Sequence, residues 1–304
     1  MKKTAGVCVI LFLLSAVLSA STVSVMNLWP DGEIPGDKEL KAPESMDQNS
    51  RVSNIRTPTL TVYLPDNENG PIPAVVICPG GGYSILSFEK EGHEVARWLN
   101  SIGMAGIILK NRVKPFQHPI PMLDGQRAVR TVRHNAEQWG IDPHKVGILG
   151  FSAGGHLAST VGTHYDSGDS EAADPVQRES CRPDFMILIY PVISMQEGIT
   201  HSGSKLNLLG ENPPQNLVDL MSNELQVTTD TPPVFLVHSD DDKSVSSKNS
   251  IDFYLALKKA HVPAEMHVYL KGGHGYGMRK EGCFAAQDWP GRCRGWLQTS
   301  GILP

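Results

Sequence analysis

The chain has 304 residues, of which 40% are hydrophobic and 19% are charged, so it can build a sizeable core in one large domain or two small ones. The low charge, the aromatic content and the near-average glycine and proline content exclude a disordered or fibrous chain. The formal net charge of -5, without any run of Lys or Arg, argues against a nucleic-acid-binding surface.

The N-terminal residues have the pattern of an export signal. Lys2 and Lys3 precede an apolar stretch from Ala5 to Leu18, and the small residues Ser19–Ser21 follow. This stretch is shorter than the roughly 20 apolar residues that a membrane span needs. We therefore expect a signal peptide over residues 1–20, cleaved near Ala20, and a secreted or periplasmic chain with no membrane segment after cleavage. An uncleaved anchor is the alternative.

Export would permit disulfide bonds. Beyond the expected signal the cysteines are Cys78, Cys181, Cys283 and Cys293. Cys78 ends an apolar run, and we expect it to be buried. Cys283 and Cys293 are close enough in sequence for a local bridge, but they could equally be two free thiols on one terminal helix. The absence of a Cys-x-x-Cys pair argues against metal ligation by cysteine.

Short apolar runs recur along the chain and predict buried strands. A strand that is apolar throughout is typical of a parallel sheet covered on both faces. The runs are Ala74–Cys78, Ala105–Leu109, Val146–Leu149, Phe185–Tyr190 and Val234–Val237, with Glu265–Leu270 as a further candidate. Before them, Arg51 to Leu64 alternates apolar and polar residues in places, which predicts early antiparallel strands.

Helical patterns separate these strands. They cover Glu89–Asn100, Leu123–Trp139, Ala153–Thr163, Ser247–Ala260 and Glu281–Gln298, and more weakly Asn212–Ser222. Strands that alternate with helices predict a mostly parallel, doubly wound α/β sheet with helices on both faces, in a single domain over residues 21–304. Pro115–Pro121 is expected to be a loop. Residues 164–183 and 194–214 are longer insertions, which we expect to form the rim or cap of a site.

Sites in open α/β sheets lie at the carboxyl ends of the strands. The strand at Val146–Leu149 runs into Gly150-Phe151-Ser152-Ala153-Gly154, and a helix follows. This is the Gly-x-Ser-x-Gly pattern of a nucleophile elbow, in which glycines make room for a tight, strained turn that exposes the serine hydroxyl. The alternative is a small-residue turn that binds an anion or nothing. His156, one helical turn later, is expected to pack beneath the elbow.

A glycine-rich turn, Pro79-Gly80-Gly81-Gly82-Tyr83, follows the strand at Ala74–Cys78. Its backbone N–H groups, together with that of Ala153, are suited to stabilise an oxyanion, where each donor is worth roughly 3–4 kcal/mol. Tyr83 is then placed to wall an acyl pocket. A phosphate cradle is the competing interpretation, but neither a following Lys-Ser/Thr nor the Gly-x-Gly-x-x-Gly spacing is present.

Two late loops carry candidate acids and a base. Asp240, Asp241 and Asp242 follow the strand at Val234–Val237, and His274 lies among glycines after Glu265–Leu270. The order Ser, Asp, His along the chain is that of α/β-hydrolases. Three adjacent carboxylates cannot all contact one imidazole, so the residues alone leave the acid open between them. His238 is expected to support the acid loop, and His267, inside a strand, to be structural.

The segments GFSAGGHLAS, CPGGGY and KGGHGYG, together with the acid loop, resemble α/β-hydrolase esterases. The chain is most similar to the secreted bacterial acetylxylan-esterase and feruloyl-esterase-like group, near the hormone-sensitive-lipase-type esterases, from about Leu28 to Leu297. The resemblance implies the α/β-hydrolase fold, a triad of Ser152, Asp242 and His274, and an oxyanion hole formed by Gly81, Gly82 and Ala153.

The assignment of Asp242 follows from the family's Asp-x-x-Val spacing, which Asp242 and Val245 match. Two positions depart from the hormone-sensitive-lipase-type pattern. Pro79 stands where that type has the His of His-Gly-Gly-Gly, and Lys243 with Ser244 replaces the Pro and apolar residue often found after the acid. The second departure favours Asp241 as the remaining alternative.

The expected function is two-step hydrolysis of carboxylic esters, first of all acetyl esters, on a plant or algal polysaccharide such as acetylxylan or on small molecules. This chemistry requires no metal and no organic cofactor. A serine peptidase of the prolyl-oligopeptidase type is one alternative, although the chain has no room for the propeller domain those enzymes usually carry. A non-catalytic glycan-binding relic is the other.

Overall fold

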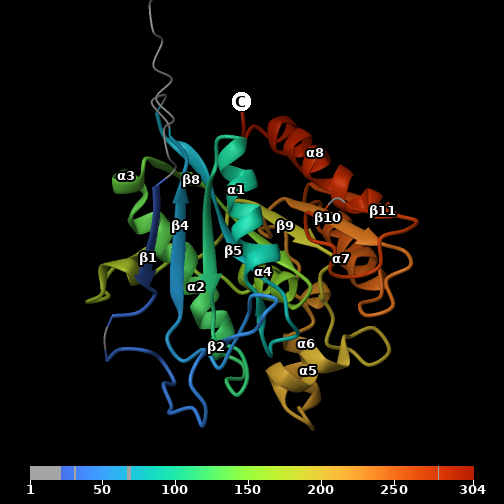
Figure 1. The fold of residues 1–304 in the computed structure, drawn as a ribbon, viewed down its shortest axis with the longest axis horizontal. Helices are drawn as coiled ribbons and strands as arrows, with labels where there is room; N and C mark the ends of the chain where they lie inside the picture. Colours follow the sequence, from blue (N-terminus) through green and yellow to red (C-terminus); the bar gives the residue numbers. More distant parts are fainter. Residues whose placement is uncertain (1–21, 31, 67–69, 280) are drawn as a thin grey trace, which may run out of the picture.

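A central sheet of eight strands organises the fold, and helices cover both of its faces (Figure 1). The structure is a computed structural model that describes residues 22–30, 32–66, 70–279 and 281–304. The expected signal peptide over residues 1–20 therefore lies outside the described residues. Within them, no helix is long and apolar enough to cross a membrane.

The strand order is β1-β4-β7-β5-β8-β9-β10-β11. Every pair from β7 to β11 is parallel, whereas β4 runs antiparallel to both β1 and β7. The strands are β1 (Thr22–Asn27), β4 (Thr59–Leu64), β5 (Ile72–Cys78), β7 (Ala105–Lys110), β8 (Ile141–Phe151), β9 (Met186–Ile189), β10 (Val234–Ser239) and β11 (Ala264–Tyr269). The predicted mostly parallel sheet is thus confirmed, and a small antiparallel sheet of β2 (Ser45–Met46), β3 (Arg51–Ser53) and β6 (Leu86–Ser87) lies beside it.

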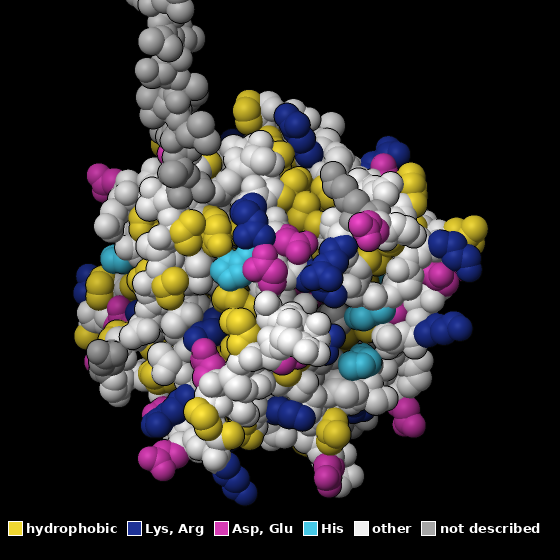
Figure 2. Space-filling model, viewed as in Figure 1, with side chains coloured by type: hydrophobic (Ala, Val, Ile, Leu, Met, Phe, Trp, Pro, Cys, Tyr) yellow, Lys and Arg dark blue, Asp and Glu magenta, His cyan; other side chains and the backbone are white. Residues whose placement is uncertain are grey.

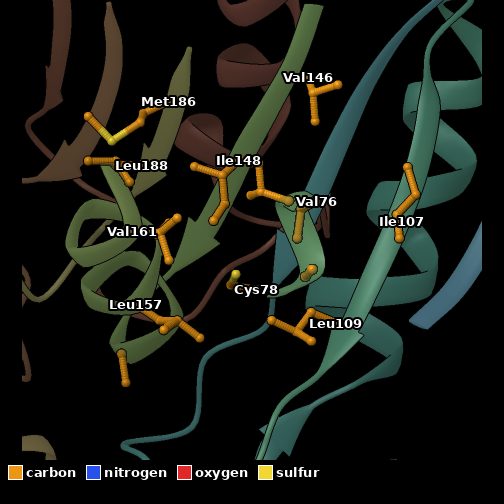
Figure 3. Close-up of a cluster of buried hydrophobic side chains, with 14 of the residues drawn as sticks. Val76, Cys78, Ile107, Leu109, Val146, Ile148, Leu157, Val161, Met186 and Leu188 are labelled. Carbon is orange, nitrogen blue, oxygen red and sulfur yellow. The ribbon is translucent and has the colours of Figure 1, made fainter. Parts of the chain in front are cut away.

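Successive residues of the buried strands point to opposite faces and fill two separate cores. In β5, Val76 packs in one core while Val75 and Ile77 pack in the other. The first core receives α2 (Ile120–His134), α4 (Ala153–Thr163) and α7 (Lys248–Lys259), and the second receives α1 (Glu94–Ser101) and α8 (Phe284–Thr299). Figure 3 shows the first core, where side chains of β5, β7, β8 and β9 meet Leu157 and Val161 of α4. Two-sided burial explains why these strands are apolar throughout.

Two helical predictions need correction. The pattern over Leu123–Trp139 forms two helices, α2 and α3 (Ala136–Trp139), that meet at Asn135. The Asn135 side chain donates to the backbone carbonyl of Thr131 at 2.7 Å, a local bond that competes with helix continuation. The pattern over Glu89–Asn100 begins with a π-helical turn, η1 (Glu89–His93), before α1.

The insertion at residues 164–183 lies at the wrong edge of the sheet to form the expected rim. It connects the end of α4 to the start of β9, and α4 runs back from the carboxyl end of β8 toward the amino ends of the strands. Arginines of α2 hold it there: Arg130 pairs with Asp166 at 2.6 Å, and Arg133 pairs at 2.9 Å with Asp184, just before β9. This segment, which includes η2 (Pro175–Arg178), is structural.

The insertion at residues 194–214 does lie at the carboxyl edge, because it follows the end of β9. It contains α5 (Ser202–Leu209), and α6 (Gln215–Leu220) and η3 (Asn223–Leu225) come next. Figure 1 shows α5 and α6 together at one end of the molecule. Asn207 donates to the carbonyl of Gly82 at 2.7 Å, and Leu208 accepts from the N–H of His118 at 2.9 Å. The insertion is therefore anchored to both the glycine turn and the loop before α2, which ends at Pro119 because the last two residues of the expected Pro115–Pro121 loop are helical.

The cysteines from Cys78 onward are all free thiols, so the two-thiol reading of the C-terminal pair is correct. Cys283 precedes the first residue of α8 and Cys293 is buried inside that helix. Cys78 is buried, as expected. On the molecular face in Figure 2, basic and acidic side chains are interspersed over the surface.

Candidate active site

The turn between β8 and α4 is strained at Ser152. This residue has φ 52° and ψ -121°, a region that side-chain-bearing residues rarely occupy. The space around the turn admits only glycine: a Cβ on Gly150 would lie 2.1 Å from the carbonyl oxygen of Gly154. A Cβ on Gly154 would lie 2.0 Å from the carbonyl oxygen of Cys78, at the end of β5. The glycines thus allow the elbow to form and to pack against the neighbouring strand.

Three side chains from distant parts of the sequence form one chain of hydrogen bonds at the elbow. The Nε2 atom of His274 lies 2.9 Å from Oγ of Ser152, and its Nδ1 atom lies 2.6 Å from Oδ2 of Asp242. Because an ionised carboxylate only accepts hydrogen bonds, Nδ1 carries the proton and donates it to Asp242. The Nε2 atom of the neutral ring is then free to accept the serine O–H.

Asp242 is buried and held in place by several donors. Its Oδ1 atom accepts the backbone N–H groups of Ser244 and Val245, each at 2.9 Å. Burial by itself raises the pKa of a carboxyl group, but hydrogen bonds from His238 and His274 outweigh it and hold the pKa of Asp242 well below its ordinary value. The group is therefore a carboxylate at neutral pH, and its negative charge stabilises the positive charge of His274 when that ring is protonated.

The neighbouring aspartates have other partners. Asp241 accepts the backbone N–H groups of Gly272 and Gly273 at 2.9 and 2.8 Å, so it fixes the loop that carries His274. Asp240 is exposed, and its N–H donates to the carbonyl of Tyr269. Of the three adjacent acids, Asp242 is the one that the structure brings to the imidazole.

The other histidines named from the sequence lie in supporting positions. His238 is buried, with Nδ1 at 2.7 Å from Oγ of Ser250 and Nε2 at 2.9 Å from the carbonyl of Val245, so it braces the acid loop. His267 pairs with Glu265 within β11. His156 is buried beneath the elbow, where burial lowers its pKa to about 4. These placements agree with the three expectations.

The predicted oxyanion donors lie in the turns that follow two neighbouring strands, β5 and β8. Ala153 is the first residue of α4, where backbone N–H groups have no intrahelical acceptor and the helix dipole favours negative charge. Within the described part of the chain, no hydrogen bond uses the N–H groups of Gly81, Gly82 or Ala153. Gly81 and Gly82 have φ values of 142° and 63°, which glycine tolerates. Gly80 differs, because its N–H donates to Glu91 at 2.8 Å.

A small, mainly apolar cavity adjoins Gly81 and Ala153. Its lining includes Gly81 and Ala153, the side chains of Tyr83, Val113 and Leu157, and the amide of Asn111, whose buried Oδ1 atom accepts no hydrogen bond within the described residues. The enclosed space is about that of one water molecule. Tyr83 is buried, and its O–H donates to Nδ1 of His156 at 2.8 Å, since Nε2 of that ring donates to the carbonyl of Met221. The ring of Tyr83 is therefore a fixed wall of this cavity.

Sequence reasoning missed a buried carboxylate, Glu91, that joins the glycine turn to the histidine loop. One oxygen accepts the N–H of Gly80, and the other accepts the O–H of Tyr190 at 2.9 Å. The Tyr190 oxygen in turn accepts the N–H of Gly277 at 2.8 Å, and its ring meets His274 edge-on with 4.9 Å between centroids. In the sequence, Glu91 is one acid in an ordinary helical pattern, so no local signal distinguishes it.

His201 is a second residue that the sequence did not single out. It precedes α5, in the insertion at the carboxyl edge, and a Cβ on Gly82 would lie 3.7 Å from its Cε1 atom. Burial lowers the pKa of His201, as does the nearby His274, while Asp242 raises it. The ring is therefore neutral at pH 7 and lies within electrostatic range of the hydrogen-bonded chain.

The arrangement is suited to acyl transfer. A serine hydroxyl, a base that can take its proton, and free N–H donors lie at one sheet edge. Among the residues that the structure describes, no group of three or more His, Cys, Asp and Glu side chains is arranged to hold a metal ion.

Comparison with known proteins agrees with this geometry. The BD-FAE family model matches residues 60–257. The crystal structure of an acetyl ester-xyloside bifunctional hydrolase from Caldicellulosiruptor lactoaceticus superposes with a TM-score of 0.84 at 43% identity, covering 92% of this chain and 97% of that one.

Two curated relatives are longer than this chain. An acetylxylan esterase from Xylanibacter ruminicola is 36% identical over 222 residues, which is 72% of this chain and 43% of the relative. An endo-1,4-beta-xylanase B from Butyrivibrio fibrisolvens is 34% identical over 239 residues, or 77% of this chain and 36% of the relative. The chain thus spans less than half the length of these two proteins.

Proposed function

The chain belongs to the BD-FAE family, within the acetylxylan- and feruloyl-esterase-like α/β-hydrolases, and on that premise we propose that it is a serine esterase that removes acetyl groups from a polysaccharide such as acetylxylan. The observation that carries the proposal is the position of His274, whose two ring nitrogens lie within hydrogen-bonding distance of Ser152 and Asp242. A nucleophile, a base and an orienting acid in this order constitute a complete acyl-transfer apparatus.

In the first step, the Oγ atom of Ser152 attacks the ester carbonyl while Nε2 of His274 takes its proton. The carbonyl oxygen becomes an oxyanion, which the N–H groups of Gly81, Gly82 and Ala153 stabilise. Asp242 keeps the Nδ1 proton on the ring and offsets the imidazolium charge. His274 then protonates the departing alcohol, leaving an acetyl group on Ser152.

In the second step, water takes the place of the alcohol. His274 removes a proton from the water, which attacks the acyl carbonyl, and the same N–H donors stabilise the second oxyanion. The imidazolium returns the proton to Ser152 as acetate leaves. The two steps need only the residues of this chain, the ester and one water molecule.

The size of the cavity beside Gly81 and Ala153 indicates that the acyl group of the substrate is short. It is mainly apolar and about the size of one water molecule, which is close to the size of a methyl group. Tyr83 and Leu157 bound it, so a longer chain would require these buried side chains to move. We therefore assign this cavity to the acetyl methyl.

The polysaccharide substrate and the location of the enzyme are part of the proposal. The curated relative named acetylxylan esterase supports the first. The basic, apolar and small residues at the N-terminus support export of residues 21–304 to the periplasm or the medium, where such a polymer is met.

Replacement of Ser152 by Ala tests the assignment of the nucleophile. We expect hydrolysis of p-nitrophenyl acetate to fall by roughly five to six orders of magnitude, because no other group can form the acyl-enzyme. The thermal unfolding midpoint should stay close to that of the native protein. Activity that survives in S152A, in protein shown to be folded, would overturn the proposal.

Substrate panels test the rest. Aryl esters of rising chain length should show a steep fall from acetate to butyrate, and acetylated xylan should release acetate. Hydrolysis of aminoacyl-arylamides in preference to aryl acetates would indicate a peptidase of the prolyl-oligopeptidase type instead. Failure of a fluorophosphonate probe to label Ser152 would indicate a glycan-binding protein without catalysis.

A further inference from the structure

We propose that His201 forms a subsite for the alcohol half of the ester, where its Nε2–H donates a hydrogen bond to a hydroxyl or ring oxygen of the sugar. The inference rests on the proposed esterase function and adds a specificity-determining residue to it. Its basis is the juxtaposition of an unused side-chain donor with the glycine turn that holds the oxyanion donors.

The position of His201 is fixed by the insertion that carries it. Asn207, later in α5, donates to the carbonyl of Gly82, and Leu208 accepts from the N–H of His118. Both bonds tie α5 to the carboxyl edge of the sheet. The His201 ring consequently lies beside Gly82, with its Cε1 atom 3.7 Å from the place that a Cβ would occupy.

The hydrogen bonds of the ring determine which nitrogen carries its proton. The backbone N–H of Ser204 donates to Nδ1 of His201 at 3.2 Å, in a helix-capping contact, and the Ser204 hydroxyl, 2.9 Å from the same nitrogen, can donate to it as well. The Nδ1 atom is therefore an acceptor, and in the neutral ring the proton lies on Nε2. No hydrogen bond within the described residues uses Nε2, and the half-buried ring keeps this atom available.

The chemistry of the two halves of the substrate indicates which half this donor meets. An acetyl group has one polar atom, the carbonyl oxygen, and the backbone donors of the glycine turn and of Ala153 take it. Its methyl fits the mainly apolar cavity beside Tyr83. A sugar alcohol, in contrast, carries several hydroxyl and ether oxygens that accept hydrogen bonds. A polar donor at the rim of the glycine turn therefore suits the sugar and not the acyl group.

The substitution His201→Asn separates this role from the structural one. The Asn side chain can still accept the N–H of Ser204, because asparagine is a preferred helix cap, but it is too short to replace the Nε2 donor. S202A, at an exposed neighbour that starts the same helix, is the matched control.

The readout is kcat/KM on two substrates. Partly acetylated xylobiose retains free hydroxyls, whereas the leaving group of p-nitrophenyl acetate has no sugar oxygen. We expect H201N to lose about tenfold on the xylobiose ester, the value of one hydrogen bond to substrate, and to match the native enzyme on the aryl ester. S202A should match the native enzyme on both.

Two results would overturn the inference. An equal loss of kcat/KM on both substrates would mean that His201 serves catalysis in general or the stability of the fold. Native kcat/KM values on both substrates would mean that His201 does not contact the sugar. In either case the native enzyme still hydrolyses aryl acetate, so the proposed function stands. If the native enzyme hydrolyses neither ester, the proposed function fails and the subsite fails with it.

Discussion

The Nδ1 atom of His274 and the Oδ2 atom of Asp242 are 2.6 Å apart, although 32 residues separate them in the sequence. A distance this short is typical of a hydrogen bond to an ionised acceptor. The bond determines which nitrogen of the ring faces Ser152 as a base. The carboxylate at position 242 thus controls the chemistry of a serine that it does not touch.

The substitution Asp242→Asn tests this control. The amide keeps the shape of the side chain but favours the other tautomer of His274, with the proton on Nε2, so we expect kcat to fall by about 10⁴-fold. D241N keeps an oxygen that can accept the N–H groups of Gly272 and Gly273, and D240N changes an exposed residue. Both should retain nearly native rates on p-nitrophenyl acetate. A larger loss in D241N than in D242N would assign the acid to Asp241.

Glu91 should act as a positioning residue. In E91Q only one oxygen remains, so either Gly80 or Tyr190 loses its acceptor, which costs about 1–3 kcal/mol for a buried donor. We expect kcat to fall by roughly tenfold or more, because both the oxyanion turn and the His274 loop depend on this bridge. Steady-state kinetics at fixed pH, with KM reported separately, measure the effect.

Glu89→Gln is the control for this variant. Glu89 lies in the same π-helical turn, but its carboxylate pairs with Arg97 at the surface. The kcat and the thermal unfolding midpoint of E89Q should stay near the native values. If E91Q lowers the midpoint and leaves kcat intact, Glu91 stabilises the fold without positioning the site.

The elbow glycines can be tested by a matched pair of glycine-to-alanine changes. A Cβ at Gly154 would lie 2.0 Å from the backbone of Cys78, so we expect G154A to destabilise the protein by about 3 kcal/mol or more. A Cβ at Gly295, an exposed position in α8, has no neighbour within 4 Å. G295A should therefore stabilise the protein by about 1 kcal/mol through helix propensity. Chemical denaturation measures both, and equal effects would refute the steric argument.

His156 predicts how stability depends on pH. Burial lowers its pKa from 6.5 to about 4 in the folded protein, so the unfolded chain binds its proton first as pH falls. The contribution of neutral His156 to the free energy of unfolding is therefore constant above pH 6.5. It is lost progressively between pH 6.5 and 4, by about 3 kcal/mol in total.

The variant H156Q, which does not titrate, should show a shallower fall in the free energy of unfolding over this range. The surface variant H144Q, at an exposed position, should follow the native curve. Urea denaturation at a series of pH values provides the comparison. Parallel curves for H156Q and the native protein would contradict the prediction.

The local sequence was sufficient for the elements and for much of the site. Apolar runs predicted five strands of the parallel part of the sheet, and Glu265–Leu270 was a further candidate for the sixth. The pattern around Ser152 predicted a tight turn between strand and helix. Both features arise from neighbouring residues, because two-sided burial requires continuous apolar side chains and a strained turn requires adjacent glycines. The edge strand β1 was not predicted, although Val23 and Val25 alternate with polar residues there. Five of its six residues are exposed, so it lacks the continuous apolar run of the buried strands.

The tertiary structure decided what depends on distance through space. It brought Asp242 rather than Asp241 to His274, moved the insertion at 164–183 away from the site, and placed Glu91 and His201 beside the glycine turn. Sequence spacing cannot show which of two adjacent aspartates reaches the histidine, because adjacent side chains point in different directions. Nor can it show at which edge of the sheet an insertion lies, because that depends on the direction of the helix before it. The sequence therefore indicated which types of chemical group form the site. Which groups contact one another was determined only by the fold, in which the carboxyl ends of the parallel strands come together.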